Sequence, residues 1–322
     1  MIVAPRGRYA PSPTGEIHLG NASTALVAWL AARSARGSFV LRMEDLDRPR
    51  VQPGSAERIL EDLAWLGLDW DEGPDRGGPH APYEQSLRRG HYDGAFSRLV
   101  ERERIYPCFC SRKDVAAAAS APQAPGDEVR YPGTCRALPA ATIEQRLGQG
   151  RPHAWRFRVD ERAIPRFVDR VRGRQEGSAE AMGDFVVRRA DGVAAYQLAV
   201  VVDDAAMGID EVVRGADLLA STARQLLLYE ALDLAPPRFA HVPLLLGPDG
   251  VRLSKRHHGT SIRELRDAGF SPSAIVGRLA RLLGFVTDDS PVAPAALLRG
   301  FAFERIVHAP EGRIVDPGEW RK

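Results

Sequence analysis

A short stretch near the N-terminus, residues 8–21 (RYAPSPTGEIHLGN), combines a turn-forming loop with side chains that can bind phosphate. A short apolar run precedes it, prolines and a glycine interrupt it, and an apolar-periodic run follows at residues 25–35. This order predicts strand, loop and helix, which places backbone N–H groups and a helix N-terminus against a phosphate. His18 and Asn21 lie about one helical turn apart, so both can reach a nucleotide. An ordinary strand–helix loop with a solvated histidine is the alternative.

A second stretch suited to phosphate chemistry lies much later, at residues 251–256 (VRLSKR). It follows a Pro-Asp-Gly turn and carries Ser254, Lys255 and Arg256 in succession. Cationic side chains on a loop can stabilise the charge that develops on a triphosphate in a transition state. By itself, Lys255 would be interpreted as a surface lysine, and only the pairing with the first stretch favours a nucleotide site.

All three cysteines of the chain, Cys108, Cys110 and Cys135, lie within one short region. Clustered cysteines without a signal peptide favour a metal site over a disulfide framework. A closed tetrahedral zinc site needs a fourth ligand. The candidates are Tyr131, His153 and His91. Tyrosine is a rare ligand, so chemistry alone favours a histidine, and buried thiols without a metal are the alternative.

Composition sets wide limits on the kind of protein. The chain has 322 residues, of which 44% are hydrophobic and 27% charged, as in ordinary globular proteins. Its formal net charge of +2 gives no overall basic signal for nucleic acid. No apolar run is long enough to span a membrane, and no signal peptide precedes the first motif. We therefore expect a cytoplasmic protein without membrane contact.

Three carboxylates, Glu44, Asp45 and Asp47, follow a strand predicted at residues 38–43. They would lie at the carboxyl edge of an α/β sheet, where such sheets bind ligands. A metal site, an amine-binding site and a helix-start cluster are all compatible with this pattern.

The second half of the predicted sheet supplies further polar side chains. Asp191-Gly192 predicts a tight hairpin turn, and its second arm, residues 193–202, ends in an apolar run that resembles a buried central strand. Residues 211–215 predict another strand. Tyr196 and Arg214 would then lie near the carboxyl edge and face the first half of the sheet across a crevice.

The two phosphate-type stretches together resemble the paired signatures of class I aminoacyl-tRNA synthetases. Other segments resemble the glutamyl branch of that family, and the matches are collinear over roughly residues 8–262. These segments are residues 8–15 (RYAPSPTG), 41–47 (LRMEDLD), 200–208 (VVVDDAAMG) and 213–217 (VRGAD).

The resemblance implies an α/β fold with a class I Rossmann-like nucleotide-binding domain in two halves, residues 1–82 and 185–250. Between them, residues 83–184 are expected to form an inserted zinc-containing segment that contacts the tRNA acceptor end. Residues 251–322 are expected to hold the Ser-Lys-Arg loop and a short helical C-terminal subdomain, with no anticodon-binding domain.

Roles for individual residues also follow from the resemblance. His18 and Lys255 are implied as the catalytic residues that stabilise charge on ATP. Gly20, Asn21 and Ser254 are implied to complete the ATP site, and Mg²⁺ is expected with ATP. Asn21 departs from the histidine that ends the family signature, although its amide can still donate to phosphate or ribose.

The same resemblance implies an amino-acid site formed by Arg8, Ala10, Ser12, Glu44, Tyr196 and Arg214. Physically, this set fits an amino acid with a second carboxylate, because arginines form forked bonds to carboxylates and Glu44 can hold the ammonium. Glutamine lacks the charge that an arginine demands, so L-glutamate is the expected substrate.

For the cysteines, the family pattern Cys-x-Cys…Tyr-x-x-x-Cys is met at Cys108, Cys110, Tyr131 and Cys135. It implies one structural Zn²⁺ with Tyr131, not a histidine, as the fourth ligand.

The chain is also similar to a sub-family, the glutamyl-queuosine tRNA(Asp) synthetases, because only about forty residues follow Leu283 and an anticodon reader is expected to be absent. This similarity implies activation of glutamate by ATP and transfer to queuosine in tRNA(Asp), by a monomer. Two alternatives are a minimal glutamyl-tRNA synthetase that charges tRNA 3′ ends and a non-catalytic paralogue.

Overall fold

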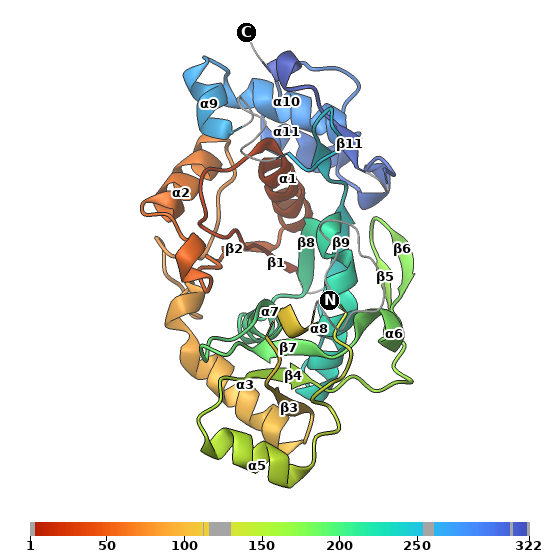
Figure 1. The fold of residues 1–322 in the computed structure, drawn as a ribbon. Coiled ribbons are helices and arrows are strands. Elements are labelled where there is room, and N and C mark those ends of the chain that lie inside the picture. The colour runs from red at the N-terminus through yellow and green to blue at the C-terminus, as the bar shows by residue number, and fades with distance from the viewer. Residues whose placement is uncertain (1–3, 112, 116–129, 254–260, 310–311, 321–322) are drawn as a thin grey trace.

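A six-stranded sheet forms the centre of the computed structural model, which describes residues 4–111, 113–115, 130–253, 261–309 and 312–320 (Figure 1). The strand order is β2-β1-β8-β9-β5-β6. Neighbours are parallel from β2 to β5, and β6 is antiparallel to β5. The bounds are β1 Arg6–Tyr9, β2 Ser38–Leu41, β5 Arg166–Asp169, β6 Gly173–Glu176, β8 Glu211–Gly215 and β9 Arg238–Val242. The carboxyl ends of β1 and β8 therefore lie side by side, as ligand binding in an α/β sheet requires.

Helix α1 (Leu19–Ser34) packs against β1, β2 and β8. It buries apolar side chains on nearly all its sides, which is typical of a helix inside a core. Helix α10 (Pro272–Leu283) packs against it. The predicted helix is therefore confirmed, but it begins earlier than the apolar run at residues 25–35, immediately after His18.

A second, antiparallel sheet of three strands, β3-β4-β7, lies in the lower part of Figure 1. Its strands are β3 Ile105–Cys108, β4 Ala154–Phe157 and β7 Phe185–Arg188. Helices α3 (Arg89–Glu101) and α5 (Ala140–Gly148) lie beside it in the same part of the molecule. A small separate core surrounds the three cysteines, so this region has packing of its own.

The pairing of strands differs from the expected boundaries of the insertion in two places. Strands β5 and β6 lie within residues 83–184, yet they extend the main sheet beside β9. Strand β7 begins after residue 184, yet it pairs with β4 of the small sheet. Each sheet therefore contains strands from more than one of the expected segments, so the sheets do not correspond to continuous ranges of the sequence.

The predicted strand at residues 193–202 is wrong, because helix α7 (Tyr196–Ala206) occupies most of it. The turn itself is present: Arg189 and Val193 are joined by a backbone hydrogen bond, and Arg188 bridges to Ala194. The chain then turns into a helix whose Leu198–Asp204 segment is buried on every side. A short, wholly apolar run fits a buried helix as well as a buried strand.

The remaining elements complete the layers around the main sheet. The helices are α2 (Ser55–Trp65), α6 (Ala179–Met182), α8 (Leu219–Ala231), α9 (Ile262–Asp267) and α11 (Pro294–Leu297). Short 3₁₀ turns are Arg48–Arg50, Gln85–Leu87, Ala216–Leu218, Leu298–Gly300, Phe303–Arg305 and Pro317–Trp320. Strands β10 (Leu245–Leu246) and β11 (Arg313–Ile314) form a small parallel pair. Among the described helices, none has both the length and the apolar character that crossing a membrane requires.

A serine lies at or near the start of three helices, a position that is typical of an N-cap. Ser271 caps α10 by accepting a hydrogen bond from the Ala274 backbone N–H. Ser55 is instead the first residue of α2, and its hydroxyl donates to the backbone carbonyl of Gly15. Helix α8 likewise begins before Ser221, without a side-chain cap. Both serines lie in the first turns of their helices rather than at the caps.

Candidate active site

A cavity of about 610 Å³ opens at the carboxyl ends of β1 and β8. All residues predicted for the ATP site and the amino-acid site that the structure describes line this cavity. They are Arg8, Ala10, Ser12, His18, Gly20, Asn21, Glu44, Tyr196 and Arg214. Ser254 and Lys255 lie outside the described residues, but Arg252 and Leu253, which directly precede them, also line the cavity. Residues that are far apart in the sequence thus meet in one place.

The loop between β1 and α1 forms one wall of this cavity. His18 occupies the N-cap position of α1, and its backbone carbonyl accepts the N–H of Ala22. His18 also forms an isolated bridge with Ser261, and the Ile262 N–H donates to the Ile17 carbonyl. The first phosphate-type stretch is therefore joined by backbone contacts to residues 261–262, which follow the second stretch in the sequence, and the N-terminus of the sixteen-residue helix α1 lines the cavity.

On one side of the cavity, a buried carboxylate holds two arginines. Asp204 on α7 accepts hydrogen bonds from Arg8 Nε at 3.2 Å and from Arg42 Nη1 at 2.7 Å. Arg8 Nη1 also donates to the Val213 carbonyl at 3.3 Å. Burial alone would raise the pKa of Asp204, but the two guanidinium groups hold it below its ordinary value. Asp204 thus stays charged and fixes both arginines.

Glu44 occupies a different electrostatic position. Its carboxylate accepts a hydrogen bond from Arg42 Nη2 at 3.3 Å, whereas Nη1 of the same guanidinium binds Asp204 at the shorter distance of 2.7 Å. Burial raises the pKa of Glu44 in spite of Arg42 and Arg8. A further positive group beside Glu44 would stabilise its charged form, and an ammonium group bound in the cavity would provide that charge.

Opposite Arg8, the guanidinium of Arg214 extends from the end of β8. Its Nε donates to His241 Nε2 at 3.0 Å, and its Nη2 donates to Thr222 Oγ1 at 2.8 Å. Its Nη1 lies 3.5 Å from the Tyr196 hydroxyl, and both residues line the cavity. Arg8, Arg214 and Glu44 therefore line one and the same cavity.

The sequence analysis did not assign a role to several residues that support this site. Four buried residues, each 5% exposed or less, do this. Asp204 binds Arg8, Thr222 and His241 bind Arg214, and Arg42 binds Asp204 and Glu44. The one available signal was the Asp203-Asp204 pair, which directly follows the apolar run at residues 193–202 that predicted a strand. Because both lie on a helix, their consecutive side chains point to different neighbours.

Asp203 holds the start of the insertion against α7. It accepts hydrogen bonds from Gln85 at 2.8 Å, Arg88 at 2.6 Å and Tyr92 at 2.8 Å. Since Asp204 holds Arg8 and Arg42, one turn of α7 connects the cavity to the segment that leads into the small sheet.

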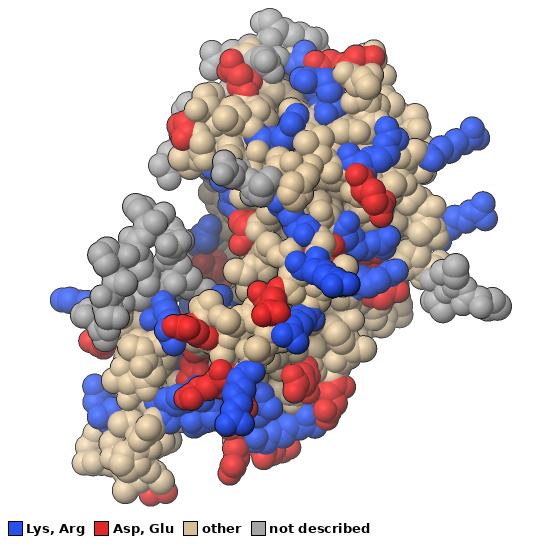
Figure 2. Space-filling view, turned by 90° about the vertical axis from the view of Figure 1, so that its right-hand side faces the viewer, with Lys and Arg blue, Asp and Glu red and all other residues tan. Residues whose placement is uncertain are grey.

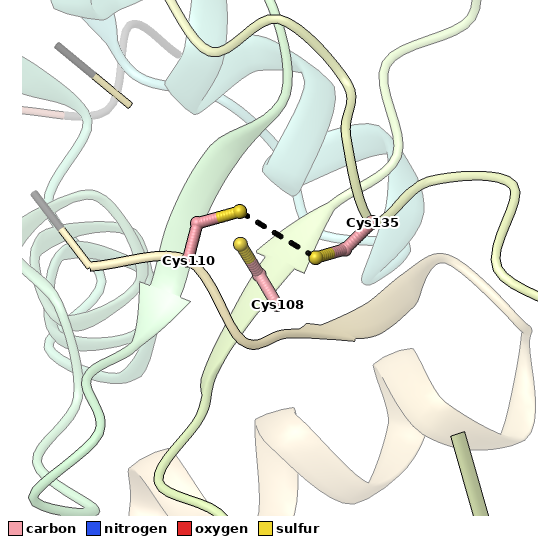
Figure 3. Close-up of side chains that lie close together, drawn as sticks. All are labelled: Cys108, Cys110 and Cys135. Atoms are coloured by element: carbon pink, nitrogen blue, oxygen red, sulfur yellow. Dashed lines mark hydrogen bonds between the residues drawn. The ribbon is translucent and has the colours of Figure 1, made fainter. Parts of the chain in front are cut away.

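The three cysteines converge in the region of the small sheet, where Figure 3 shows their sulfur atoms turned toward one another. The Sγ atoms of Cys108, Cys110 and Cys135 lie within 4.8 Å of each other, and those of Cys110 and Cys135 are 3.6 Å apart. The Tyr131 hydroxyl lies 3.4 Å from Cys108 Sγ and 3.9 Å from Cys110 Sγ. The cluster can hold a metal ion, and its soft donors suit zinc.

Neither histidine that the sequence offered as a fourth ligand belongs to this cluster. The ring of His153 lies against Phe109 and Trp155, and its Nδ1 is 3.1 Å from the Arg151 carbonyl. His91 is exposed on α3. Burial, followed by the contact with Cys135, raises the pKa of the Cys110 thiol to about 11, and a cation beside the sulfur would favour its ionised form at neutral pH.

Basic residues alternate with apolar ones in residues 153–174, a pattern that fits solvated strand faces as well as a surface that follows a phosphate backbone. Arg166 pairs with Glu176 at 2.8 Å, and Arg170 pairs with Glu211 at 2.6 Å. Acidic and basic side chains are interspersed on the face shown in Figure 2. At these two arginines, the pairs favour solvated strand faces.

Comparison with known proteins agrees with this geometry. Residues 5–293 match the family model described as tRNA synthetases class I (E and Q), catalytic domain. A protein of Symbiobacterium thermophilum named "Glutamyl-Q tRNA(Asp) synthetase" is 53% identical over 305 residues, covering 94% of each chain. A protein of the same name from Nitratidesulfovibrio vulgaris is 52% identical, covering 90% of this chain and 89% of its own.

The crystal structure of a glutamate-tRNA synthetase from Elizabethkingia anophelis superposes with a TM-score of 0.86 at 32% identity, covering 98% of this chain and 69% of its own. The chain therefore belongs to the class I glutamyl and glutaminyl tRNA synthetase family and, within it, to the glutamyl-Q tRNA(Asp) synthetases.

Proposed function

We propose that this chain activates L-glutamate with ATP and transfers the glutamyl group to queuosine in tRNA(Asp). The observation that carries the proposal is the convergence of Arg8, Arg214 and Glu44 on one cavity whose wall is the N-terminus of α1. Two relatives that match about nine-tenths of the chain are named for this reaction. Because tRNA is a substrate, a cytoplasmic location is part of the proposal.

The charges of the cavity are complementary to glutamate. The substrate carries two carboxylates and one ammonium, and Arg8, Arg214 and Glu44 have the charges that match these groups. Other charged residues also line the cavity, namely Arg50, Arg252, Glu16 and Asp217, and of these Arg252 is paired with Asp217. Glu44 is the proposed partner of the ammonium, and Arg8 and Arg214 are the proposed partners of the carboxylates. Glutamine would leave one buried arginine without a charged partner, so the site discriminates against it.

In the first step, an oxygen of the substrate's α-carboxylate forms a bond to the α-phosphorus of ATP, and pyrophosphate leaves. In the second step, a hydroxyl of the tRNA attacks the acyl carbon, and AMP leaves. No side-chain nucleophile is required, so positioning and electrostatic stabilisation provide the rate. His18 and Lys255 are the proposed partners of the phosphate charge, with Gly20, Asn21 and Ser254 beside them. Bound Mg²⁺ neutralises part of the charge on ATP.

For the cysteine cluster, we infer one structural Zn²⁺ held by Cys108, Cys110 and Cys135, with Tyr131 as the fourth ligand. The support is the convergence of three sulfurs and a phenol, with no histidine among the metal-binding side chains that gather there in the described part of the chain. Such a site has no open position for catalysis, so its contribution is the stability of the small sheet.

The experiment that tests the proposal has two stages. Glutamate-dependent exchange of pyrophosphate into ATP should occur, and glutamine should support it at least about 100-fold less efficiently. Labelled glutamate should then be transferred to tRNA(Asp), and the tRNA should be cut into an anticodon fragment and a 3′ fragment. Label in the anticodon fragment supports the proposal, and label in the 3′ fragment supports a minimal glutamyl-tRNA synthetase. Absence of any exchange would indicate a non-catalytic paralogue.

A further inference from the structure

Three adjacent strands of the main sheet contribute one side chain each to a buried chain of hydrogen bonds behind the cavity. Arg214 on β8 is directly paired in register with His241 on β9, and Asp169 ends β5 on the far side of β9. Arg214, His241 and Asp169 are 5%, 0% and 1% exposed. Only Arg214 of the three lines the cavity, so the other two can influence a ligand there solely through Arg214.

The donors and acceptors of this chain assign the proton on the His241 ring. Arg214 Nε always carries a hydrogen, so His241 Nε2, at 3.0 Å from it, must be the acceptor. The ring proton then lies on Nδ1 and is donated to Asp169 Oδ2 at 2.6 Å. Burial first, and then Arg214, lower the pKa of His241, which agrees with a neutral ring.

The backbone fixes the carboxylate of Asp169 at the other end. Its Oδ1 accepts the N–H groups of Val171 at 3.0 Å, Arg172 at 2.8 Å and His241 at 3.2 Å. One oxygen is therefore occupied by the backbone, and the other is directed at the histidine. Burial alone would raise the pKa of Asp169, but His241 and these N–H groups hold it below its ordinary value.

At Arg214, this arrangement determines which nitrogen faces the substrate. Arg214 Nε donates its hydrogen bond to His241, and Arg214 Nη2 donates to Thr222 Oγ1. Thr222 Oγ1 in turn lies 3.3 Å from His241 Nε2. Nη1 is left beside Tyr196 at the cavity wall. A rotation of the guanidinium would break the bonds to both His241 and Thr222.

We propose that Asp169 and His241 are positioning residues that hold the guanidinium of Arg214 in the orientation that receives a glutamate carboxylate. This inference rests on the proposed function, because it concerns the affinity of the same cavity for its amino acid. A carboxylate binds best to a guanidinium that is already correctly oriented. The selectivity of the cavity for a carboxylate therefore depends on how firmly its neighbours hold Arg214.

The variant Asp169→Asn tests this directly because it keeps the size of the side chain and the oxygen that the backbone binds. The new amide nitrogen donates to His241 Nδ1, so the ring proton moves to Nε2. Two N–H donors, His241 Nε2 and Arg214 Nε, then face each other, and the hydrogen bond between them is lost. We expect the KM for glutamate in pyrophosphate exchange to rise about 10- to 100-fold, the scale of one hydrogen bond to a charged group. The KM for ATP should change less than about twofold, since no ATP contact is altered.

A second substitution should rescue the first. In Asp169→Asn/His241→Gln, the glutamine oxygen can accept from Arg214 Nε and no ring proton is involved, so most of the lost glutamate affinity should return. The matched control is Glu176→Gln on neighbouring β6, where the paired side chains are exposed, and it should leave both KM values unchanged.

Nitrogen-15 NMR of the histidine rings supplies a readout that needs no substrate. The unmodified chain should show a neutral His241 ring with its proton on Nδ1, and Asp169→Asn should move it to Nε2. A ring protonated on Nε2 in the unmodified chain, or an unchanged KM for glutamate in Asp169→Asn, would overturn the inference. Absence of glutamate-dependent exchange in the unmodified chain would instead contradict the proposed function, and the NMR result would still decide the arrangement of the ring.

Discussion

The cavity and the cysteine cluster both gather chemically active side chains, but they differ in how their charges are balanced. In the cavity, Arg8 and Arg42 have Asp204 as a counter-ion, and Arg214 is held by neutral acceptors. In the cluster, three sulfurs lie together beside a phenol. The cavity is therefore formed in advance by the protein's own groups, whereas the sulfurs can ionise together only when a cation joins them.

This difference separates two consequences of mutation. Removing a counter-ion in the cavity leaves a buried charge uncompensated and should destabilise the whole fold. Removing a ligand from the cluster should loosen the small core around the cysteines and leave the activation of glutamate largely intact.

The largest expected effect on stability is that of Asp204→Ala. It leaves the guanidinium groups of Arg8 and Arg42 buried without their carboxylate, which costs about 3–5 kcal/mol in the free energy of unfolding. Urea unfolding followed by circular dichroism measures this loss. Glu176→Ala, which breaks an exposed pair with Arg166, should cost less than about 1 kcal/mol. Equal losses in the two variants would show that the cavity is not organised by Asp204.

The largest expected effect on activity alone is that of Lys255→Ala. Loss of one charge contact in the transition state should reduce pyrophosphate exchange by about 10²-fold or more while the thermal midpoint stays within a few degrees. Lys113→Ala, at an exposed position in the region of the cysteine cluster, is the matched control and should be fully active. Near-normal exchange by Lys255→Ala would refute its assignment to the phosphates.

At the cluster, Cys135→Ser should abolish stoichiometric zinc, as measured by elemental analysis of the purified protein. His153→Ala is the matched control and should keep the metal, because this ring packs on Phe109 and Trp155 instead of joining the sulfurs. In Cys135→Ser, the thermal midpoint should fall, yet pyrophosphate exchange at 25 °C should stay within about twofold of normal. Loss of exchange in proportion to loss of zinc would mean that the two regions are not separable.

The smallest effect is the pH dependence that Glu44 should confer. Burial raises its pKa above the ordinary value in the empty cavity, and an ammonium beside it favours the charged form. Affinity for glutamate is therefore complete above this raised pKa and is lost as the pH falls through it, by up to about tenfold for each pH unit. The KM for glutamate measured between pH 5.5 and 8 should show this acid limb, and Glu44→Gln should bind weakly at every pH without the limb. A limb of the same size in Glu44→Gln would assign it to another group.

Local patterns with a single structural solution were predictable from the sequence. The turn-rich stretch before His18, and Ser271 followed by Pro272 at the first position of α10, mark the starts of helices with little ambiguity. Strand β8 was also predictable from its apolar residues. The convergence of the signature residues on one cavity followed from the family resemblance and from the parallel order of β1 and β8.

What could not be predicted depends on contacts between distant segments. The apolar run before Asp203 fits a strand or a buried helix equally, and only its packing decides for α7. Asp169 and His241 are isolated polar residues in separate strands, and their link to Arg214 exists only because β5, β9 and β8 are neighbours. The frequency of metal ligands alone would have predicted a histidine as the fourth ligand instead of Tyr131.

The most direct test of the proposed reaction is the transfer of labelled glutamate to bulk tRNA from two sources, one containing queuosine and one lacking it. If the chain glutamylates queuosine, label should appear on the first tRNA and be absent from the second. Equal labelling of both tRNAs would contradict the proposal and show that the glutamyl group is attached elsewhere, as in the charging of a 3′ end.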